Sequence, residues 1–487
     1  MSDVIIGVKR EGDYESGVDE SGPEPEQKER QEPEQKDQNS EGNETGIALH
    51  RSVWKLAWPS VLTMVLQTLN SFIDRFFVGH LGSDALAAVG IGGQVLSVLF
   101  AVGMSISAGT TALVSRAKGA DNTGEAREAA NQSLWIAVIA SALCVAVTWP
   151  LRRVAVGLLH VNPAASDLCV RYLSWTLLGI PALFLMLIVS AVLRGLNDTL
   201  TPLRVMVGVD LIHIGGDYLL IFGHFGLPRL GLTGGAVALI VSQVVGAALY
   251  FWFVQKSRVR GFVTCLKRPD FGWAKRILSV GGPAAAQNVS QVLSAMVFTG
   301  VLAHSPEGTS AVTALTIGQT SEGIATMPGF GFAAAAETLS GQHLGADKAD
   351  QAERSGWASL QQGAGLMVAM GVVFFVFAKP FAHIFTHDPH VVPLTVAYLR
   401  ITALSEPFLA LGLILSGALN GAGDTKAPAW AGIITLWGFR LPLAWLLIFH
   451  LHLGATGAWW AMMVTTVLDG LIVLWLFKQG GWKKTKV

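Results

Sequence analysis

The stretch LRGLNDTLTP at 193–202 recurs as LNGAGDTKAP at 419–428. Two further stretches recur after each copy in the same order: LLIF at 219–222 and again at 446–449, and GLTGGAVA at 231–238, which returns as GATGAWWA at 454–461. Recurrence of this kind indicates that one structural unit occurs twice in the chain. The sequence therefore predicts a protein built from two related halves.

Apolar segments surround these repeats and recur along the chain from Val53 onward. Hydrophobic residues make up 51% of the 487 residues and charged residues only 14%, whereas ordinary soluble domains carry about 25% charged residues. About 20 apolar residues suffice for a helix to cross a hydrocarbon layer about 30 Å thick. We predict an all-α integral membrane protein with twelve transmembrane helices, at 53–78, 85–115, 132–151, 170–193, 202–222, 233–255, 276–303, 311–338, 356–378, 396–418, 428–449 and 455–477.

The repeat divides the twelve spans into two lobes of six helices. Because six is an even number, both lobes start on the same side of the membrane, which predicts a pseudo-twofold axis along the membrane normal. We expect an N-lobe at 51–255 with helices 1–6, a cytoplasmic linker at 256–275, and a C-lobe at 276–477 with helices 7–12. Two such lobes facing a central cavity are typical of alternating-access carriers.

The two ends of the chain differ in charge. Residues 1–50 hold 14 of the 34 acidic residues and are rich in Glu, Gln, Pro and Ser, which predicts a disordered acidic tail, either a solvated extension or a docking segment. Residues 478–487 form a basic C-terminus. Lys and Arg gather in the loops on the side of the tail, so the positive-inside rule places both termini in the cytoplasm of a multi-pass protein.

Ionisable side chains inside spans are costly and therefore mark candidate functional sites. Asp74 lies in the first span, and Asp210, His213 and Asp217 lie in the fifth. His213 and Asp217 are four residues apart and share a helix face. Buried carboxylates suit proton uptake and release near neutral pH, and their oxygens also suit sodium. The repeat aligns Asp217 with Ala444, so we place a cation-coupling site in the N-lobe alone.

These residues also have structural interpretations. The acids could brace helices through buried hydrogen bonds, and His213 is either a proton relay, because imidazole titrates near neutral pH, or a packing histidine. Glu406 and Arg440 are expected to form a buried pair between spans ten and eleven.

Several classes of chemistry lack their motifs. The sequence has no GxxxxGK[ST] phosphate loop, no HExxH and no GxSxG, so ATP-driven transport and enzyme activity are not predicted. No cofactor is expected beyond a proton or sodium gradient, no metal beyond sodium at Asp74 and Asp217, and no nucleic acid as a partner.

Several motifs resemble those of the multidrug and toxic compound extrusion (MATE) family: WPSVLTMVLQTLNSFIDRFFVGHLG at 58–82, DYLLIFG at 217–223 and MPGFGFAAAAETLSGQHLGA at 327–346. The likeness covers nearly all residues after the tail and is greatest for the bacterial branch that includes the DNA-damage-inducible protein F. It implies multidrug efflux: antiport of small organic cations or other amphipathic molecules against protons or sodium, by a monomer in the inner (plasma) membrane.

The resemblance also implies site residues. Asp74 and Asp217 occupy the family's N-lobe cation-site positions, and His213 stands where many relatives have Asn, which favours protons over sodium. Another branch has acids on helices seven and ten, where this chain has Gln291 and Leu409, so a C-lobe cation site is not expected. Residues expected to line the substrate cavity are Gln67, Asn70, Gln291, Glu322 and Met327.

Two other functions remain as alternatives. A lipid-linked oligosaccharide flippase of the same superfamily would show extra spans and a basic cavity. A membrane sensor would use the acidic tail to bind partners, and deletion of residues 1–45 distinguishes it from a transporter.

Overall fold

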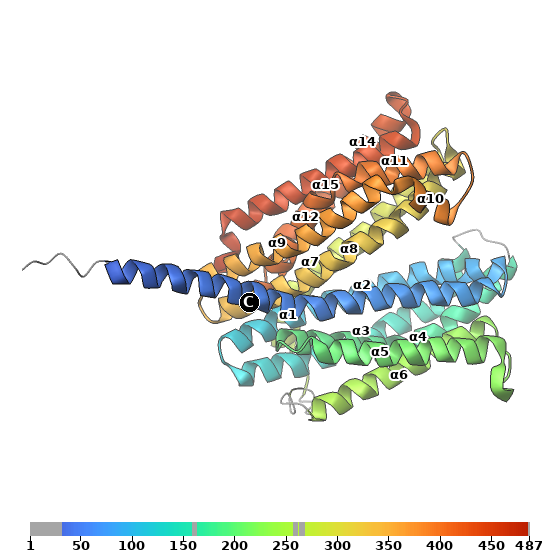
Figure 1. Ribbon diagram of the computed structural model, residues 1–487. Coiled ribbons are helices and arrows are strands. Elements are labelled where there is room, and N and C mark those ends of the chain that lie inside the picture. Colours follow the sequence, from blue (N-terminus) through green and yellow to red (C-terminus); the bar gives the residue numbers. More distant parts are fainter. Residues whose placement is uncertain (1–31, 158–162, 257–261, 263–267, 486–487) are drawn as a thin grey trace, which may run out of the picture. The chain divides into compact units, whose positions relative to one another are not determined.

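The computed structural model describes residues 32–157, 163–256, 262 and 268–485. The chain divides into two units, Met1–Ala48 and Leu49–Val487. In the first unit, the described residues 32–48 are helical. In the second unit, every regular element of the described residues is a helix (Figure 1).

The helices of the first half follow the predicted spans. They are α1 (Glu32–Gly79), α2 (Ser83–Gly119), α3 (Thr123–Gly157), α4 (Pro163–Gly195), α5 (Leu200–Phe222) and α6 (Leu232–Lys256), with a 3₁₀ turn at His224–Gly226. The start of α1 differs from the expectation, because the composition predicted disorder through residue 50. Glu, Gln and Lys are good helix formers, and residues 32–48 form helix here. The remaining tail, 1–31, and the linker segments 257–261 and 263–267 lie outside the described residues.

The second half contains two broken spans. Its elements are α7 (Phe271–Ala303), α8 (Gly308–Gly345), α9 (Ala349–Val376), α10 (Ala378–Phe385), α11 (Val391–Ala403), α12 (Glu406–Gly421), α13 (Lys426–Ile433), η2 (Ile434–Arg440), α14 (Leu441–Trp445), η3 (Leu446–His450), α15 (Gly454–Gln479) and η4 (Gly481–Lys484). The tenth span bends by 56° between α11 and α12. Pro407 lies at the start of α12, where a proline lacks the N–H that a continuous helix requires. The eleventh span contains the π-helical turns η2 and η3 around Pro442.

The described residues contain enough long helices for the predicted spans. Nine helices are long and apolar enough to cross a membrane, and the bent pair α11–α12 makes ten. The 33-residue α7 and the 38-residue α8 are also long enough to span. The all-α membrane fold with twelve transmembrane helices is thereby confirmed.

The repeated motifs form the same local structure in both lobes. In the first copy, Asp198 Oδ1 accepts a hydrogen bond from the backbone N of Thr201 at 2.9 Å, and in the second, Asp424 Oδ1 accepts one from Ala427 at 3.4 Å. The sequence repeat is therefore a structural repeat.

The first helix of each lobe begins among the helices of the other lobe. Val53 at the start of α1 packs in a core with Phe332 of α8, whereas Val78 near its end packs with α4 and α6. Ile277 at the start of α7 likewise packs in the core of α2–α4, and Phe298 packs in the second lobe. Any rearrangement of the lobes must therefore move α1 and α7.

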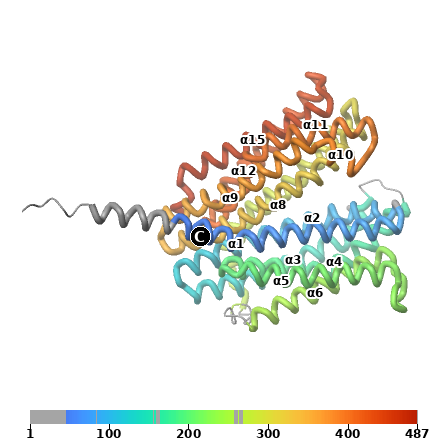
Figure 2. Tube along the Cα trace, viewed as in Figure 1, coloured from blue at the N-terminus to red at the C-terminus, as the bar shows by residue number. Residues whose placement is uncertain are grey.

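Backbone contacts between α2 and α8 join the lobes near the C-terminus of the chain, where the two groups of helices converge in Figure 2. A Cβ atom at Gly119 would overlap the carbonyl oxygen of Gln342, and one at Gly345 would overlap that of Arg116. The side chain of Gln342 also donates to the carbonyl oxygen of Gly195 at 2.8 Å. The glycines thus permit a backbone-to-backbone seal between the lobes.

We expect Gly119→Ala to open this seal. The added methyl group overlaps backbone, which cannot move aside as a flexible side chain can, and overpacking of this kind costs about 1–3 kcal/mol. Spin labels on the exposed residues 118 and 348, in a background without native cysteines, should report a longer distance. Gly282→Ala is the matched control, because a Cβ there meets nothing within 4 Å. Unchanged distances in Gly119→Ala would contradict the proposed seal.

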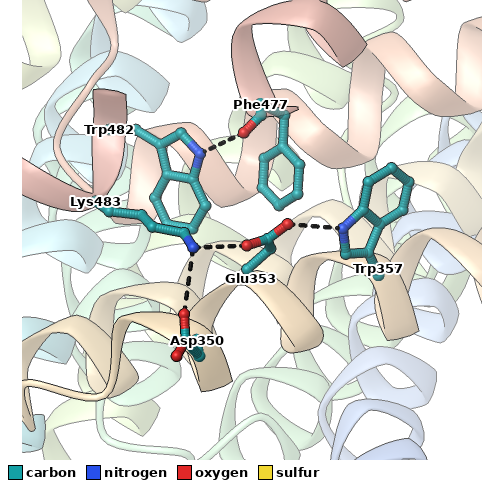
Figure 3. A network of polar contacts seen from close by, with 6 residues as sticks. All are labelled: Asp350, Glu353, Trp357, Phe477, Trp482 and Lys483. Carbon is teal, nitrogen blue, oxygen red and sulfur yellow. Dashed lines mark hydrogen bonds and ion pairs between the residues drawn. The ribbon is translucent and has the colours of Figure 1, made fainter. Parts of the chain in front are cut away.

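The C-terminal segment is attached to the start of α9 (Figure 3). Trp482 is buried, stacks on Phe477 and donates its indole N–H to the carbonyl oxygen of Phe477 at 2.9 Å. Lys483 Nζ lies 2.6 Å from Glu353 Oε2 and 3.4 Å from Asp350 Oδ1. The hydrogen bond to Glu353 raises the pKa of Lys483 above its ordinary value, so the ammonium stays charged through neutral pH.

Candidate cation-coupling site

Two helices of the first lobe bring three ionisable side chains together. Asp74 of α1 and His213 and Asp217 of α5 each present one ligand atom, and these atoms lie within 4.8 Å of one another. His213 Nε2 is 3.6 Å from Asp217 Oδ2. His213 is 5% exposed and Asp217 is fully buried. The i, i+4 spacing on α5 produces the His213–Asp217 contact, and α1 supplies the second carboxylate.

Asn70 holds the other side of the imidazole ring. It lies one turn before Asp74 on α1, and its side-chain Nδ2 is 3.0 Å from His213 Nδ1 while its Oδ1 is 3.3 Å away. The amide can donate to Nδ1 of a neutral ring that carries its proton on Nε2, or accept from the Nδ1–H of a protonated ring. Asn70 can therefore satisfy His213 in both charge states, which suits a ring that gains and loses a proton.

The two carboxylates of the cluster favour a bound cation or proton. Neither carboxylate oxygen of Asp217 has a hydrogen-bond partner among the described residues. A Cβ atom at Gly235 of α6 would lie only 3.6 Å from Asp217 Oδ1, so the carboxylate is closely enclosed. A buried carboxylate without a hydrogen-bond partner is costly, and the half-buried Asp74, which interacts electrostatically with Arg75, adds a second one. The arrangement can therefore bind protons, or a metal ion held by carboxylate oxygens.

Asp210 lies apart from this cluster. It occupies α5 one turn before His213, is 5% exposed, and has no hydrogen-bond partner for either oxygen among the described residues. Its carboxylate is not one of the grouped ligand atoms. Of the four residues predicted for cation coupling, the structure thus places three together, and the role of each stays a prediction.

The residues predicted to line the substrate cavity fall into two groups. Gln67 of α1 contacts the sulfur of Met206 on α5 at 4.0 Å, and Thr68 donates to the sulfur of Met327 on α8 at 3.4 Å, across the two lobes. Together with Asn70, these residues lie on or against the helix that carries Asp74. Gln291 is exposed on α7, and Glu322 accepts a hydrogen bond from Tyr398 within the second lobe.

Arg440 belongs to a buried network of the second lobe. Its guanidinium donates to Thr465 Oγ1 at 2.9 Å and to Thr466 Oγ1 at 3.1 Å, and it interacts electrostatically with Glu322 and Asp469.

The expected Glu406–Arg440 pair is not among the contacts of the described residues. Glu406 is 3% exposed, and its Oε2 atom has no hydrogen-bond partner there. The break between α11 and α12 starts a new helix at Glu406, whose side chain packs against α9, where a Cβ at Gly371 would lie 3.0 Å from Glu406 Cγ.

Three further residues that interact with the candidate side chains were not predicted from the sequence. Tyr172 of α4 interacts electrostatically with Asp74 and Asp217, and Tyr398 bonds Glu322. No sequence signal distinguishes either tyrosine from an ordinary aromatic residue of a span. Asp469 did carry a signal, because it is an ionisable residue inside the predicted span 455–477.

Comparisons with known proteins agree with this architecture. A sequence model described as MatE matches residues 59–219 and 283–446, one stretch in each half. The chain is 32% identical over 444 residues to a probable multidrug resistance protein NorM of Thermotoga maritima, covering 90% of this chain and 94% of the relative. Two solved structures are similar in fold. A mutant of the Vibrio cholerae MATE transporter VcmN has a TM-score of 0.83 at 24% identity, covering 89% of this chain and 97% of that one. A MOP superfamily transporter from Pyrococcus furiosus has 0.84 at 21% identity, covering 90% and 97%.

Proposed function

Because this chain belongs to the MATE family of multi-pass membrane transporters, as its motifs predicted, we propose that it exports small amphipathic or cationic organic molecules by antiport against protons. The observation that carries the proposal is the cluster of Asp74, His213 and Asp217, whose ligand atoms lie close enough together to share a proton or a cation. The transporter would act as a monomer in the plasma membrane, with both termini in the cytoplasm.

The cluster can couple a proton to movement of the lobes through α1. Protonation of Asp217 or Asp74 removes a negative charge from the cluster and alters the electrostatic interaction between α1 and α5. Helix α1 also contacts the second lobe. Val53 packs there, and further along Thr68 donates to Met327 of α8. A change in the position of α1 therefore alters its contacts with both lobes. If proton binding weakens substrate binding, substrate binding must weaken proton binding by the same factor.

Protons are favoured over sodium by the histidine. Sodium is a hard cation that prefers oxygen ligands, and His213 presents nitrogen atoms to the cluster. A histidine beside two carboxylates instead adds a third group with an atom that can accept a proton. Sodium held by Asp74 and Asp217 is the alternative.

Replacing His213 by asparagine tests this preference. We expect His213→Asn to depend less on the proton gradient and to gain dependence on sodium, because an amide oxygen replaces a protonatable nitrogen while both carboxylates remain. The measurement is the rate of dye transport by reconstituted vesicles at a fixed dye concentration, under a proton gradient and under a sodium gradient. Asn70→Gln, which keeps an amide opposite the ring, serves as the comparison. An unaltered ion dependence of His213→Asn would contradict the assigned role of the imidazole.

The function itself is tested by dye transport. Purified protein is reconstituted in vesicles, and efflux of a fluorescent cationic dye is followed under a proton gradient or a sodium gradient imposed separately. We expect export on the proton gradient. Export on neither gradient would argue against the proposed antiport and would favour the lipid-linked oligosaccharide flippase. Retained export after deletion of residues 1–45 would leave the sensor alternative without support.

A further inference from the structure

We propose that the start of the α1 span binds one anionic phospholipid, with the phosphate between Arg51 and Lys55 and an acyl chain in the groove that follows them. This site lies on the outer surface of the helices, and it serves neither cation coupling nor export in the function proposed above.

An apolar groove of about 210 Å³ lies along α1, α8 and α9. Its lining residues are Trp54, Trp58, Val61, Leu62, Val65, Phe332 and Leu366. The two tryptophans are exposed, at 50% and 38%, whereas Phe332 forms the closed floor at 0%. The Trp54 and Phe332 rings lie 6.0 Å apart between centroids. The groove thus bridges a helix of the first lobe and helices of the second.

The α1 residues that line the groove form one stripe on the helix, together with two cationic residues. Arg51, Trp54, Lys55, Trp58, Val61, Leu62 and Val65 recur at intervals of three and four residues, which places them on one helix face. From residue 51 to residue 65 the stripe is about 21 Å long at 1.5 Å per residue. One leaflet with its headgroups is also about 20–22 Å thick. The stripe therefore matches one lipid in length, with its charge at one end.

The polar end of the stripe has unused hydrogen-bonding and charged groups. Arg51 and Lys55 are both exposed, and the described residues provide neither an ion-pair partner nor a hydrogen bond for them, in contrast to Lys483. The indole N–H groups of Trp54 and Trp58 also have no partner in that part of the chain. Between residues 45 and 73 the sequence contains no Asp or Glu. Basic residues beside a span attract anionic lipids, and tryptophan prefers the interfacial region.

The corresponding helix of the second lobe lacks this stripe. In the Pro59/Pro283 register, Trp54, Lys55 and Trp58 correspond to Leu278, Ser279 and Gly282, although Arg51 corresponds to Lys275. The leading helix of a lobe therefore does not require tryptophans at these two positions, or a lysine at the position of Lys55, for its fold. The asymmetry points to a ligand bound only on α1.

The test uses the delipidated full-length protein. Native mass spectrometry counts bound palmitoyl-oleoyl phosphatidylglycerol and, separately, the zwitterionic phosphatidylcholine with the same chains. We expect one preferred phosphatidylglycerol, and binding about 30-fold weaker in the double variant Arg51→Gln/Lys55→Gln, at about fivefold for each cation removed. Trp58→Ala should weaken binding of both lipids. Lys275→Gln, at the corresponding position of α7, should bind as wild type does.

Three results would overturn the proposal. The first is equal affinity for the two lipids in wild type, and the second is undiminished phosphatidylglycerol binding by the double variant. The third concerns protection from thermal unfolding. If glycerol 3-phosphate protects the protein as well as phosphatidylglycerol does, a headgroup alone occupies the site. The charge-retaining variant Arg51→Lys/Lys55→Arg should keep the lipid and shows that loss in the glutamine variant reflects charge rather than misfolding.

Discussion

The Asp217→Asn protein is expected to remain folded and to bind dye, but not to export it on an imposed proton gradient. The amide has the shape of the carboxylate but cannot take up a proton, so binding of substrate and proton can no longer influence one another. Couplings of this kind typically change affinity by about 5- to 150-fold, and we expect the ratio of transport with and without the gradient to fall to one. Asp74→Asn should behave in the same way.

The stability of Asp217→Asn distinguishes a coupling role of the carboxylate from a structural role in which it braces helices. Both oxygens of Asp217 lack a hydrogen-bond partner among the described residues, so a neutral amide relieves a buried charge. We therefore expect the thermal unfolding temperature of Asp217→Asn in detergent to equal or exceed that of wild type. Asp167→Asn, on the exposed face of α4, is the control for both assays. Normal transport by Asp217→Asn, or marked destabilisation, would show that the residue is structural.

Replacing Arg440 by methionine should cost about 3–5 kcal/mol of stability, because removal of one partner leaves buried charges uncompensated. The affected groups are Glu322 and Asp469, and the hydroxyl groups of Thr465 and Thr466 lose their donor. Thermal unfolding or the folded fraction in detergent measures this loss.

Two further variants test the origin of that loss. Arg400→Gln removes an exposed arginine from α11 and should change stability by less than about 0.5 kcal/mol, as surface substitutions usually do. Adding Glu322→Gln to Arg440→Met should restore part of the stability, because it removes one of the uncompensated charges. If the double variant is no more stable than the single one, the charge explanation is wrong.

Much of the fold could be predicted because the bilayer restricts the choices. A helix must be about 20 residues long to cross, and the repeat from LRGLNDTLTP to LNGAGDTKAP sets the number of lobes. Pro407 and Pro442 are recognisable in sequence as bend points. The 56° break before Pro407 and the π-helical turns around Pro442 depend on how neighbouring helices receive the freed backbone groups, which sequence alone does not show.

The candidate site could be predicted only where one helix determines it. His213 and Asp217 are neighbours by spacing on α5, and the family resemblance adds Asp74. The pairing of Asn70 with His213 and the separation of Asp210 from the cluster depend on how α1 packs against α5. The Glu406–Arg440 pair was wrong for a similar reason, because the helix break before Glu406 changes which neighbour its side chain meets.

Proton release on substrate binding is the expected result if this cluster couples protons to export. Purified protein in weakly buffered detergent solution is mixed with a cationic dye while a pH indicator follows the medium. If the cluster of Asp74, His213 and Asp217 couples protons to substrate, the wild-type protein releases protons in proportion to bound dye, and Asp217→Asn binds dye with markedly smaller release. Dye binding without proton release in wild type, or equal release by Asp217→Asn, would contradict the account.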